Sequence, residues 1–395
     1  MPTIRWAAWA DDVDLELPFP PGWSVTECPP ADAADIGPDG IAAAFAQPIG
    51  APPLHELARG GRTACVVIDD LTRPTPGARL LPTVLDELNA GGIADEHVTI
   101  LVGIANHRPM LGPDLLRKIG PEALSRCRVS QHLSWEGCLP VGTTTRGTPV
   151  ELNAIWMAAD VRILVGSIIP HAGTGFSGGA KLLMPGIASI GAAEAFHRGP
   201  VMQGRYDVVE TEARLDAEEA ARIGGATAIV NTVPTSRMGV AGLVVGDLVA
   251  AHRAGVAIAQ RVFATHAPSG ADVAVLSLYP KDGEFLQHLT AFAPYKTAPE
   301  PIVREGGTIV VAVAASEGFG YHALFGPGRR MAAPSGTRVR GRDVVFFCPN
   351  LYPTEVPPGT MLLRSWDDTL GWLTDKHGGT ATASVFPCAT IQLGR

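Results

Sequence analysis

Cysteine is sparse in this chain of 395 residues, and its six cysteines form no CxxC pair. Scattered thiols in a long chain are typical of a reduced compartment and argue against a disulfide framework. Charged residues make up only 18 %, and no basic block interrupts the formal net charge of −8, which disfavours a nucleic-acid surface. No apolar run approaches the roughly 20 residues of a membrane span, and no signal-peptide core opens the chain. We therefore expect a cytoplasmic protein that contacts neither nucleic acid nor membrane.

Several common catalytic signatures are missing as well. The chain has no HExxH motif and no Cys–His cluster, so a conventional zinc site is unsupported. The segment 173–178 matches the dinucleotide pattern GxGxxG, but Lys181 and Pro185 follow where a helix should already have opened. Gly179-Ala-Lys181 also breaks the GK[ST] ending of a Walker loop. Neither nucleotide motif is therefore convincing by itself.

Hydrophobic residues make up 46 % of the chain, and the length exceeds that of one ordinary domain. Apolar strand-like runs alternate with helical patterns along most of it, which predicts an α/β fold with parallel or mixed sheets flanked by helices. The composition shifts at 264–270, where we expect a linker. We predict an N-terminal cofactor-binding domain at 1–266, a C-terminal domain at 267–395 that closes over the substrate, and an active site in the cleft between them.

Polar residues follow three of the expected strands, at 63–69, 97–102 and 161–167. Asp70 and Arg73 come after the first, His107 and Arg108 after the second, and the segment His171–Lys181 after the third. Ligands of parallel sheets bind beyond the carboxyl ends of the strands, so these three loops point to one shared site.

The stretch 170–186, PHAGTGFSGGAKLLMPG, carries the densest signal, with four glycines at 173–179. Such glycines let the backbone approach a bulky polar ligand. Lys181 is either a phosphate-binding amine or a covalent attachment point made nucleophilic by burial. His197 is either a helix C-cap or a metal ligand.

The other polar residues also allow two interpretations. Asp70 and Arg73 either form a structural ion pair or aim Arg73 at a carboxylate. Arg108 either binds a carboxylate in the same way or holds a phosphate. His107 and His171 are either structural or acid–base groups on opposite sides of a substrate, and their position at strand ends favours catalysis. We treat the remaining candidates as structural: His132, His252, His288, His322 and Trp366.

Four sequence blocks together resemble the lactate racemase family, whose members use a nickel-pincer nucleotide. They are DDLTRP at 69–74, NHRPM at 106–110, GTTTRGTPVELN at 142–153 and PHAGTGFSGGAKLLMPGIA at 170–188. His197, sixteen residues beyond Lys181, matches the family's nickel-binding histidine in spacing. Because the four blocks occur in the same order, the match is far more specific than any one of them.

The resemblance implies a role for each matching residue. Lys181 would carry the cofactor, a nickel complex of pyridinium-3-thioamide-5-thiocarboxylic acid mononucleotide, through its thioamide, and His197 would bind nickel. The cofactor and its phosphate would also be held by the group Asp70, Arg73, Ser177, Gly178 and Gly179. His107 and His171 would be the acid–base pair of an isomerase that inverts C2 of an α-hydroxy acid by reversible hydride transfer.

Substrate contacts would come from Arg73, Arg108 and Gln287, and here the chain departs from the family. Thr290 stands where the family has a substrate-binding lysine three residues after the glutamine, and a lost charge-assisted hydrogen bond costs about 1–3 kcal/mol. Asn106 replaces a frequent threonine beside His107. These differences predict a substrate other than lactate.

Two alternative functions stay open: an NAD(P)-dependent dehydrogenase built on the GxGxxG segment, and a non-catalytic protein that binds the nickel cofactor. The resemblance also implies partners, namely the proteins that make and load the cofactor.

Overall fold

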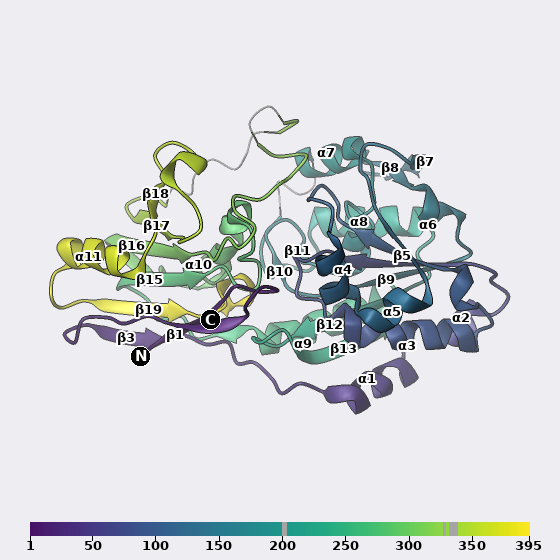
Figure 1. Ribbon diagram of the computed structural model, residues 1–395, viewed down its shortest axis with the longest axis horizontal. Helices are drawn as coiled ribbons and strands as arrows, with labels where there is room; N and C mark the ends of the chain where they lie inside the picture. Colours follow the sequence, from purple (N-terminus) through teal and green to yellow (C-terminus); the bar gives the residue numbers. More distant parts are fainter. Residues whose placement is uncertain (200–203, 327–328, 332–338) are drawn as a thin grey trace. The chain divides into compact units, whose positions relative to one another are not determined.

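The computed structural model of the chain describes residues 1–199, 204–326, 329–331 and 339–395. It divides into two compact units. The large unit comprises Ala33–Val262 with His322–Leu324, and the small unit comprises Met1–Asp32, Phe263–Tyr321 and Phe325–Arg395. Each unit has its own six-stranded sheet with helices around it (Figure 1).

The large unit is an α/β domain built on a mostly parallel sheet. Its spatial strand order is β13-β12-β9-β4-β5-β6, and only β13 runs antiparallel to its neighbour. In chain order the elements are α1 (Gly37–Ala46), α2 (Leu54–Ala58), β4 (Ala64–Asp69), α3 (Gly77–Ala90), η1 (Asp95–His97), β5 (Val98–Gly103), α4 (Gly112–Ile119), α5 (Pro121–Arg126), β6 (Arg128–Gln131), β7 (Cys138–Thr143), β8 (Pro149–Asn153), α6 (Ala154–Ala158), β9 (Val161–Ser167), β10 (Pro170–His171), β11 (Gly175–Phe176), η2 (Gly179–Leu182), α7 (Ile190–Arg198), α8 (Glu212–Ile223), β12 (Ala228–Pro234), β13 (Val240–Gly246) and α9 (Ala250–Val262).

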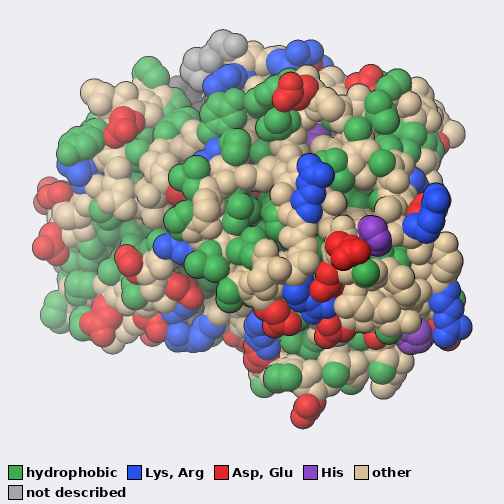
Figure 2. Space-filling view, turned by 45° about the vertical axis from the view of Figure 1, so that its right-hand side comes forward, with side chains coloured by type: hydrophobic (Ala, Val, Ile, Leu, Met, Phe, Trp, Pro, Cys, Tyr) green, Lys and Arg blue, Asp and Glu red, His purple; other side chains and the backbone are tan. Residues whose placement is uncertain are grey.

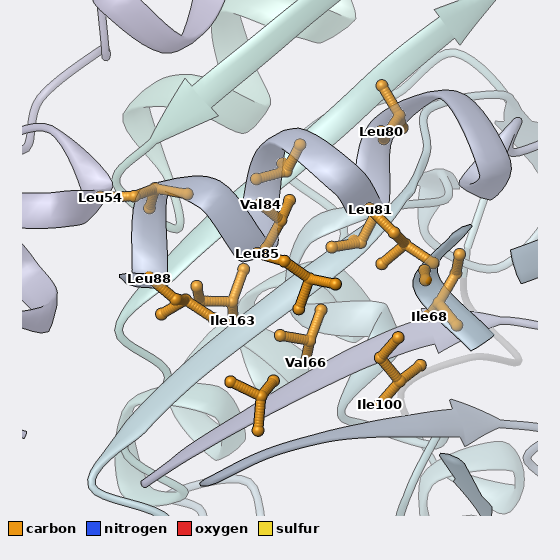
Figure 3. Packing of buried hydrophobic residues seen from close by; sticks show 14 of the residues in the cluster. Leu54, Val66, Ile68, Leu80, Leu81, Val84, Leu85, Leu88, Ile100 and Ile163 are labelled. Carbon is orange, nitrogen blue, oxygen red and sulfur yellow. The ribbon is translucent and has the colours of Figure 1, made fainter. Parts of the chain in front are cut away.

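The central strands are apolar because helices cover both faces of a parallel sheet. Every residue of β4 is buried, and so is nearly every residue of β9. Helix α3 lays a stripe of leucine and valine side chains over these strands (Figure 3). Each fully buried side chain of this kind contributes about 1.5–3 kcal/mol. The residues labelled in Figure 3 are Leu54, Val66, Ile68, Leu80, Leu81, Val84, Leu85, Leu88, Ile100 and Ile163.

The strand order of the large unit places a switch point between β4 and β9. From β4 the chain continues outward through β5 and β6, whereas β9, β12 and β13 extend the sheet on the other side. Loops that leave two neighbouring strands in opposite directions open a crevice at their carboxyl ends, where ligands of such folds bind. The loops after β4 and β9 are the ones that carry Asp70 and Lys181.

The small unit holds a second sheet, ordered β18-β17-β16-β15-β19-β3 and parallel throughout. Its elements are β1 (Thr3–Trp6), β2 (Val13–Glu16), β3 (Ser24–Glu27), β14 (Ala264–Thr265), β15 (Ala271–Ser277), η4 (Phe285–Phe292), α10 (Ala293–Thr297), β16 (Val303–Ala312), β17 (Asp343–Phe347), η5 (Pro353–Glu355), β18 (Met361–Leu363), α11 (Trp366–His377), β19 (Thr382–Phe386), η6 (Ala389–Ile391) and β20 (Leu393–Gly394).

The N-terminal segment belongs to the small unit, in contrast to the expected domain at 1–266. Strand β3 pairs in parallel with β19, and both chain termini lie in this unit (Figure 1). The reason is long-range pairing, which the local sequence does not encode. The later boundary falls at 262/263, close to the expected 266/267.

The α/β class and most of the expected strands are confirmed. Among the described residues, no helix is both long and apolar enough to cross a bilayer. All six cysteines are free thiols, and four of them are buried. Figure 2 shows basic and acidic side chains interspersed over one face of the molecule.

Candidate active site

A pocket opens at the switch point of the large unit, with a cavity volume of about 60 Å³. It gathers residues that are far apart in the sequence but follow neighbouring strands. Its lining residues are Asp69, Asp70, Thr72, Arg73, Gly103, Ala105, His107, Ser167, Ser177, Gly178, Lys181, Leu182, Pro185 and Gly186. The expectation that three strand ends share one site is therefore met for the loops after β4, β5 and β9.

Asp70 and His107 form a buried carboxylate–imidazole pair at one side of the pocket. His107 Nδ1 lies 2.6 Å from Asp70 Oδ2, and the other oxygen of Asp70 accepts hydrogen bonds from the backbone and hydroxyl of Thr72. Burial opposes the charge of Asp70, but His107, Arg73 and Thr72 outweigh it and hold the pKa of this carboxyl below its ordinary range. The ionised Asp70 therefore accepts a hydrogen bond from Nδ1–H of His107, which leaves Nε2 of the neutral ring with a lone pair that can act as a base.

Lys118 binds the backbone of the loop that carries Asp70 and Arg73. It was not among the candidate residues from the sequence. Its fully buried ammonium lies 2.7 Å from Asp69 Oδ1 and donates to the carbonyl oxygens of Asp70 and Arg73 at 2.8 and 2.9 Å. It lies in the last turn of α4, where a basic residue is ordinarily favoured by the helix dipole. No periodicity in the sequence distinguishes it from such a residue.

Lys181 lines the pocket and makes a close side-chain contact with His171, which is not among the lining residues. His171 Nδ1 receives the backbone N–H groups of Gly173 at 3.0 Å and Thr174 at 3.2 Å, and the Thr174 hydroxyl lies 3.2 Å away. His171 Nε2 lies 2.7 Å from Lys181 Nζ. Burial, with the charges of Arg73 and Arg214, lowers the pKa of Lys181 well below its ordinary value.

Buried side chains from α8, β12 and α9 hold the glycine loop from behind. Arg214 donates to the carbonyl oxygens of Gly178, at 3.0 Å, and Phe176. His252 Nε2 donates to Ser177 O at 2.9 Å. The charged residues of α8 have the pattern of a solvated helix face, but Arg214 is fully buried. Its signal was an alanine-rich face at 213, 217, 220 and 221.

The residues expected to hold a phosphate have internal partners in this state. Ser177 donates its hydroxyl to Ser167 O at 2.7 Å, and the N–H of Gly179 donates to Asn231 Oδ1 at 2.6 Å. Gly178 and Gly179 have φ of +74° and +56°, and a Cβ on Gly178 would lie 2.8 Å from Asn231 Oδ1. These glycines are thus required by the tight turn itself, and phosphate binding stays a prediction.

His197 lies in the last turn of α7, and its ring has a defined orientation. Its Nδ1 lies 2.7 Å from the carbonyl oxygen of Ala193, so Nδ1 carries the proton and Nε2 keeps a lone pair. Burial, with smaller contributions from Lys181 and His107, lowers the pKa of His197 to about 4. A neutral imidazole whose second nitrogen donates to a backbone carbonyl is the usual arrangement of a metal-binding histidine.

His322 is a further histidine of this site, although we had treated it as structural. Its ring lies edge-to-face on His107 with centroids 5.3 Å apart, and the two residues form a β-bridge. The adjacent N–H of Ala323 donates to Asn106 O at 2.7 Å. Burial, together with His107 and His197, lowers the pKa of His322 to about 2, so the ring stays neutral. Nothing in the local sequence marked it.

The three residues expected to bind substrate have different surroundings. Arg73 lines the pocket, and its guanidinium donates to the hydroxyl of Thr72 at 2.8 Å. Arg108 forms an ion pair with Asp114 of α4 at 2.8 Å and is not among the lining residues of the pocket. Gln287 lies in η4 of the small unit, so its contact with substrate stays a prediction.

Comparison with known proteins decides the family. The model of the lactate racemase N-terminal domain matches residues 11–208. The chain belongs to the lactate racemase family. Lactate racemase of Lactiplantibacillus plantarum is 30 % identical over 289 residues, covering 70 % of this chain and 67 % of that one. Lactate racemase of Thermoanaerobacterium thermosaccharolyticum is 29 % identical over 295 residues, covering 73 % and 68 %.

Solved structures show the same fold. The lactate racemase apoprotein from Thermoanaerobacterium thermosaccharolyticum superimposes with a TM-score of 0.76 at 22 % identity, over the whole of both chains. A structural-genomics protein from Thermotoga maritima gives 0.67 at 16 % identity, covering 88 % of this chain and all of that one. The two-domain α/β fold is thereby confirmed, and the family relationship supports a racemase, that is, an isomerase.

One of the four family blocks proves to be a structural support. In the β7–β8 hairpin, the hydroxyls of Thr144 and Thr148 donate to the two carboxylate oxygens of Asp216 at 2.5 and 2.6 Å. These bonds attach the hairpin to α8, the helix whose Arg214 holds the glycine loop. The block therefore contacts α8, and α8 in turn contacts the glycine loop through Arg214.

Proposed function

We propose that this chain is a racemase or epimerase that inverts C2 of an α-hydroxy acid, with a nickel-pincer nucleotide bound covalently to Lys181. The observation that carries the proposal is that two residues lining one pocket, Asp70 and Lys181, each contact a histidine. Asp70 holds His107 as a base, and His171 contacts the amine of Lys181, another lining residue of the pocket, at 2.7 Å. A family of racemases provides the reaction type.

The residues present fit such a cofactor. No group of three or more metal-ligating side chains occurs among the described residues, so a metal here would need most of its ligands from an organic group. His197, oriented by Ala193 O, would supply one nitrogen ligand, and Lys181 would supply the covalent link. When bound, the cofactor would supply an acceptor for the hydride of C2, and the hydride could return to either face of that carbon.

The histidines would handle the proton of the substrate hydroxyl. His107 Nε2 is prepared to accept that proton, and the carboxylate of Asp70 stabilises the resulting imidazolium. His171 presents Nε2–H in this state, so it is prepared to donate; acting as a base requires Nδ1 to leave the N–H groups of Gly173 and Thr174. Arg73 would hold the substrate carboxylate, for which a guanidinium is suited.

We propose a substrate other than lactate. Thr290, in place of the family's lysine, is a neutral residue whose hydroxyl donates to Gln287 O at 2.9 Å. A longer or more polar hydroxy acid would make additional contacts with the protein, and these would compensate for the missing lysine. We further propose that the enzyme works in the cytoplasm and receives its cofactor from the proteins that make it.

The dehydrogenase alternative is disfavoured by where the glycines lie. The GxGxxG segment follows β9, not the first strand of the sheet, and runs into the short 3-10 helix η2. A dinucleotide fingerprint instead opens a full helix, whose N-terminus binds the pyrophosphate.

The test is racemisation of C2-deuterated hydroxy acids by cofactor-loaded enzyme. We expect inversion with the deuterium retained at C2, because the same hydride returns, and we expect loaded His107→Gln to be inactive. Loss of deuterium to solvent would contradict hydride transfer. Cofactor binding without inversion of any substrate would favour the binding protein, and oxidation that consumes NAD would favour the dehydrogenase.

A further inference from the structure

The contact between His171 and Lys181 restricts the protonation states of both groups. Two backbone N–H groups, of Gly173 and Thr174, are directed at His171 Nδ1. A nitrogen that accepts two hydrogens cannot carry one itself, so the neutral ring must have its proton on Nε2. That proton then lies on the 2.7 Å line to Lys181 Nζ.

An ammonium group cannot accept this proton. Lys–NH₃⁺ has three donors and no lone pair, so placing it 2.7 Å from an N–H would set two donors against each other. The amine form has a lone pair and accepts the bond. The alternative, an imidazolate beside an ammonium, would require a second deprotonation of a ring that is already neutral. The contact is therefore satisfied only when Lys181 is uncharged.

The surroundings of Lys181 favour the same state. Arg73 lines the same pocket, and Arg214 is buried behind the glycine loop, so two permanent positive charges act on the amine. Burial and these two charges lower the pKa of Lys181 well below its ordinary value. Lys118 provides a contrast within the same unit: burial lowers its pKa too, but it lies 2.7 Å from the carboxylate of Asp69, whose negative charge acts in the opposite direction.

We propose that His171 has a role before any substrate binds: in the unloaded enzyme its Nε2–H holds Lys181 as a neutral amine, the nucleophilic form of this side chain. An unperturbed lysine would be only about 0.1 % neutral near pH 7.4. His171 would thus first prepare the attachment lysine, and after attachment its Nε2 would be released to the substrate. This inference rests on the proposed function only for the purpose of the neutral amine, which is attachment of the cofactor.

Lysine NMR tests the proposal on unloaded enzyme. The chain has only five lysines, so labelling lysine with ¹³C and ¹⁵N gives few Cε and Nζ signals. Lys181→Met assigns the signal of interest. Between pH 7 and 8 we expect Lys181 to show amine shifts, whereas Lys118 and the exposed lysines show ammonium shifts. An ammonium signal for Lys181 in this range would overturn the proposal.

Two substitutions separate His171 from burial alone. His171→Gln places an amide near the former Nε2, whose oxygen can accept a hydrogen bond from an ammonium, so Lys181 is no longer restricted to the neutral form and its charged fraction should rise at the same pH. His171→Asn keeps an acceptor near Nδ1 for the loop N–H groups but removes the donor, and should also raise the charged fraction. Lys181 staying neutral in both folded variants would show that His171 is not the cause. Because no turnover is measured, these results stand whether or not the loaded enzyme racemises a hydroxy acid.

Discussion

Replacing Lys118 by methionine should destabilise the large unit and loosen the loop that carries Asp70. The ammonium is fully buried and makes three short contacts, to Asp69 Oδ1 at 2.7 Å and to the carbonyls of Asp70 and Arg73. Methionine fills similar volume but leaves the Asp69 carboxylate buried without its cation. Removing one partner of a buried ion pair costs about 3–5 kcal/mol.

The expected effect is large enough to measure by thermal unfolding. For a unit of this size, each kcal/mol lowers the midpoint by about 2–4 °C, so we expect a drop of about 6–20 °C. The double variant Lys118→Met with Asp69→Asn should recover part of this loss, since it removes the unpaired charge. A midpoint within about 1 °C of the unmodified protein, or a double variant less stable than the single one, would refute the reasoning.

Three further predictions concern the site and its surroundings. Asp70→Asn should lower the racemisation kcat, counted per bound cofactor, by about 10²–10⁴-fold, since an amide neither fixes the tautomer of His107 nor stabilises its charge; undiminished activity would contradict the pairing. Burial lowers the pKa of His132 from 6.5 to about 4, so its contribution of about 3 kcal/mol is present above pH 6.5 and is lost as pH falls toward 4; His132→Leu should flatten the unfolding free energy across that window, and an unchanged slope would count against it. Thr290→Lys should raise activity on lactate by about 10-fold or more, as expected for one restored charge-assisted hydrogen bond; no gain would remove this explanation of specificity.

The central strands and the three loops of the site were predictable because their signals are local. The runs at 64–69, 98–103 and 161–167 are apolar and β-branched, and the polar residues follow them directly. The strand-end rule then brings Asp70, His107 and Lys181 together without further information.

Contacts between distant segments were not predictable. Strand β3 has mostly exposed residues and is defined by its pairing with β19, more than 350 residues later. The buried charges Lys118 and Arg214 look like surface residues of amphipathic helices until the loops they hold are in place. His322 joins His107 through a segment whose sequence has no distinguishing motif.

The central claim is that Lys181 carries a nickel cofactor, and the most direct measurement is the intact mass and nickel content of protein co-produced with the cofactor-making proteins. A Lys181→Ala variant, produced in the same way, is the control. The account predicts a covalent adduct with about one nickel per chain that is absent from the control. An unmodified mass without nickel in the unsubstituted protein, or an adduct that persists in Lys181→Ala, would contradict it.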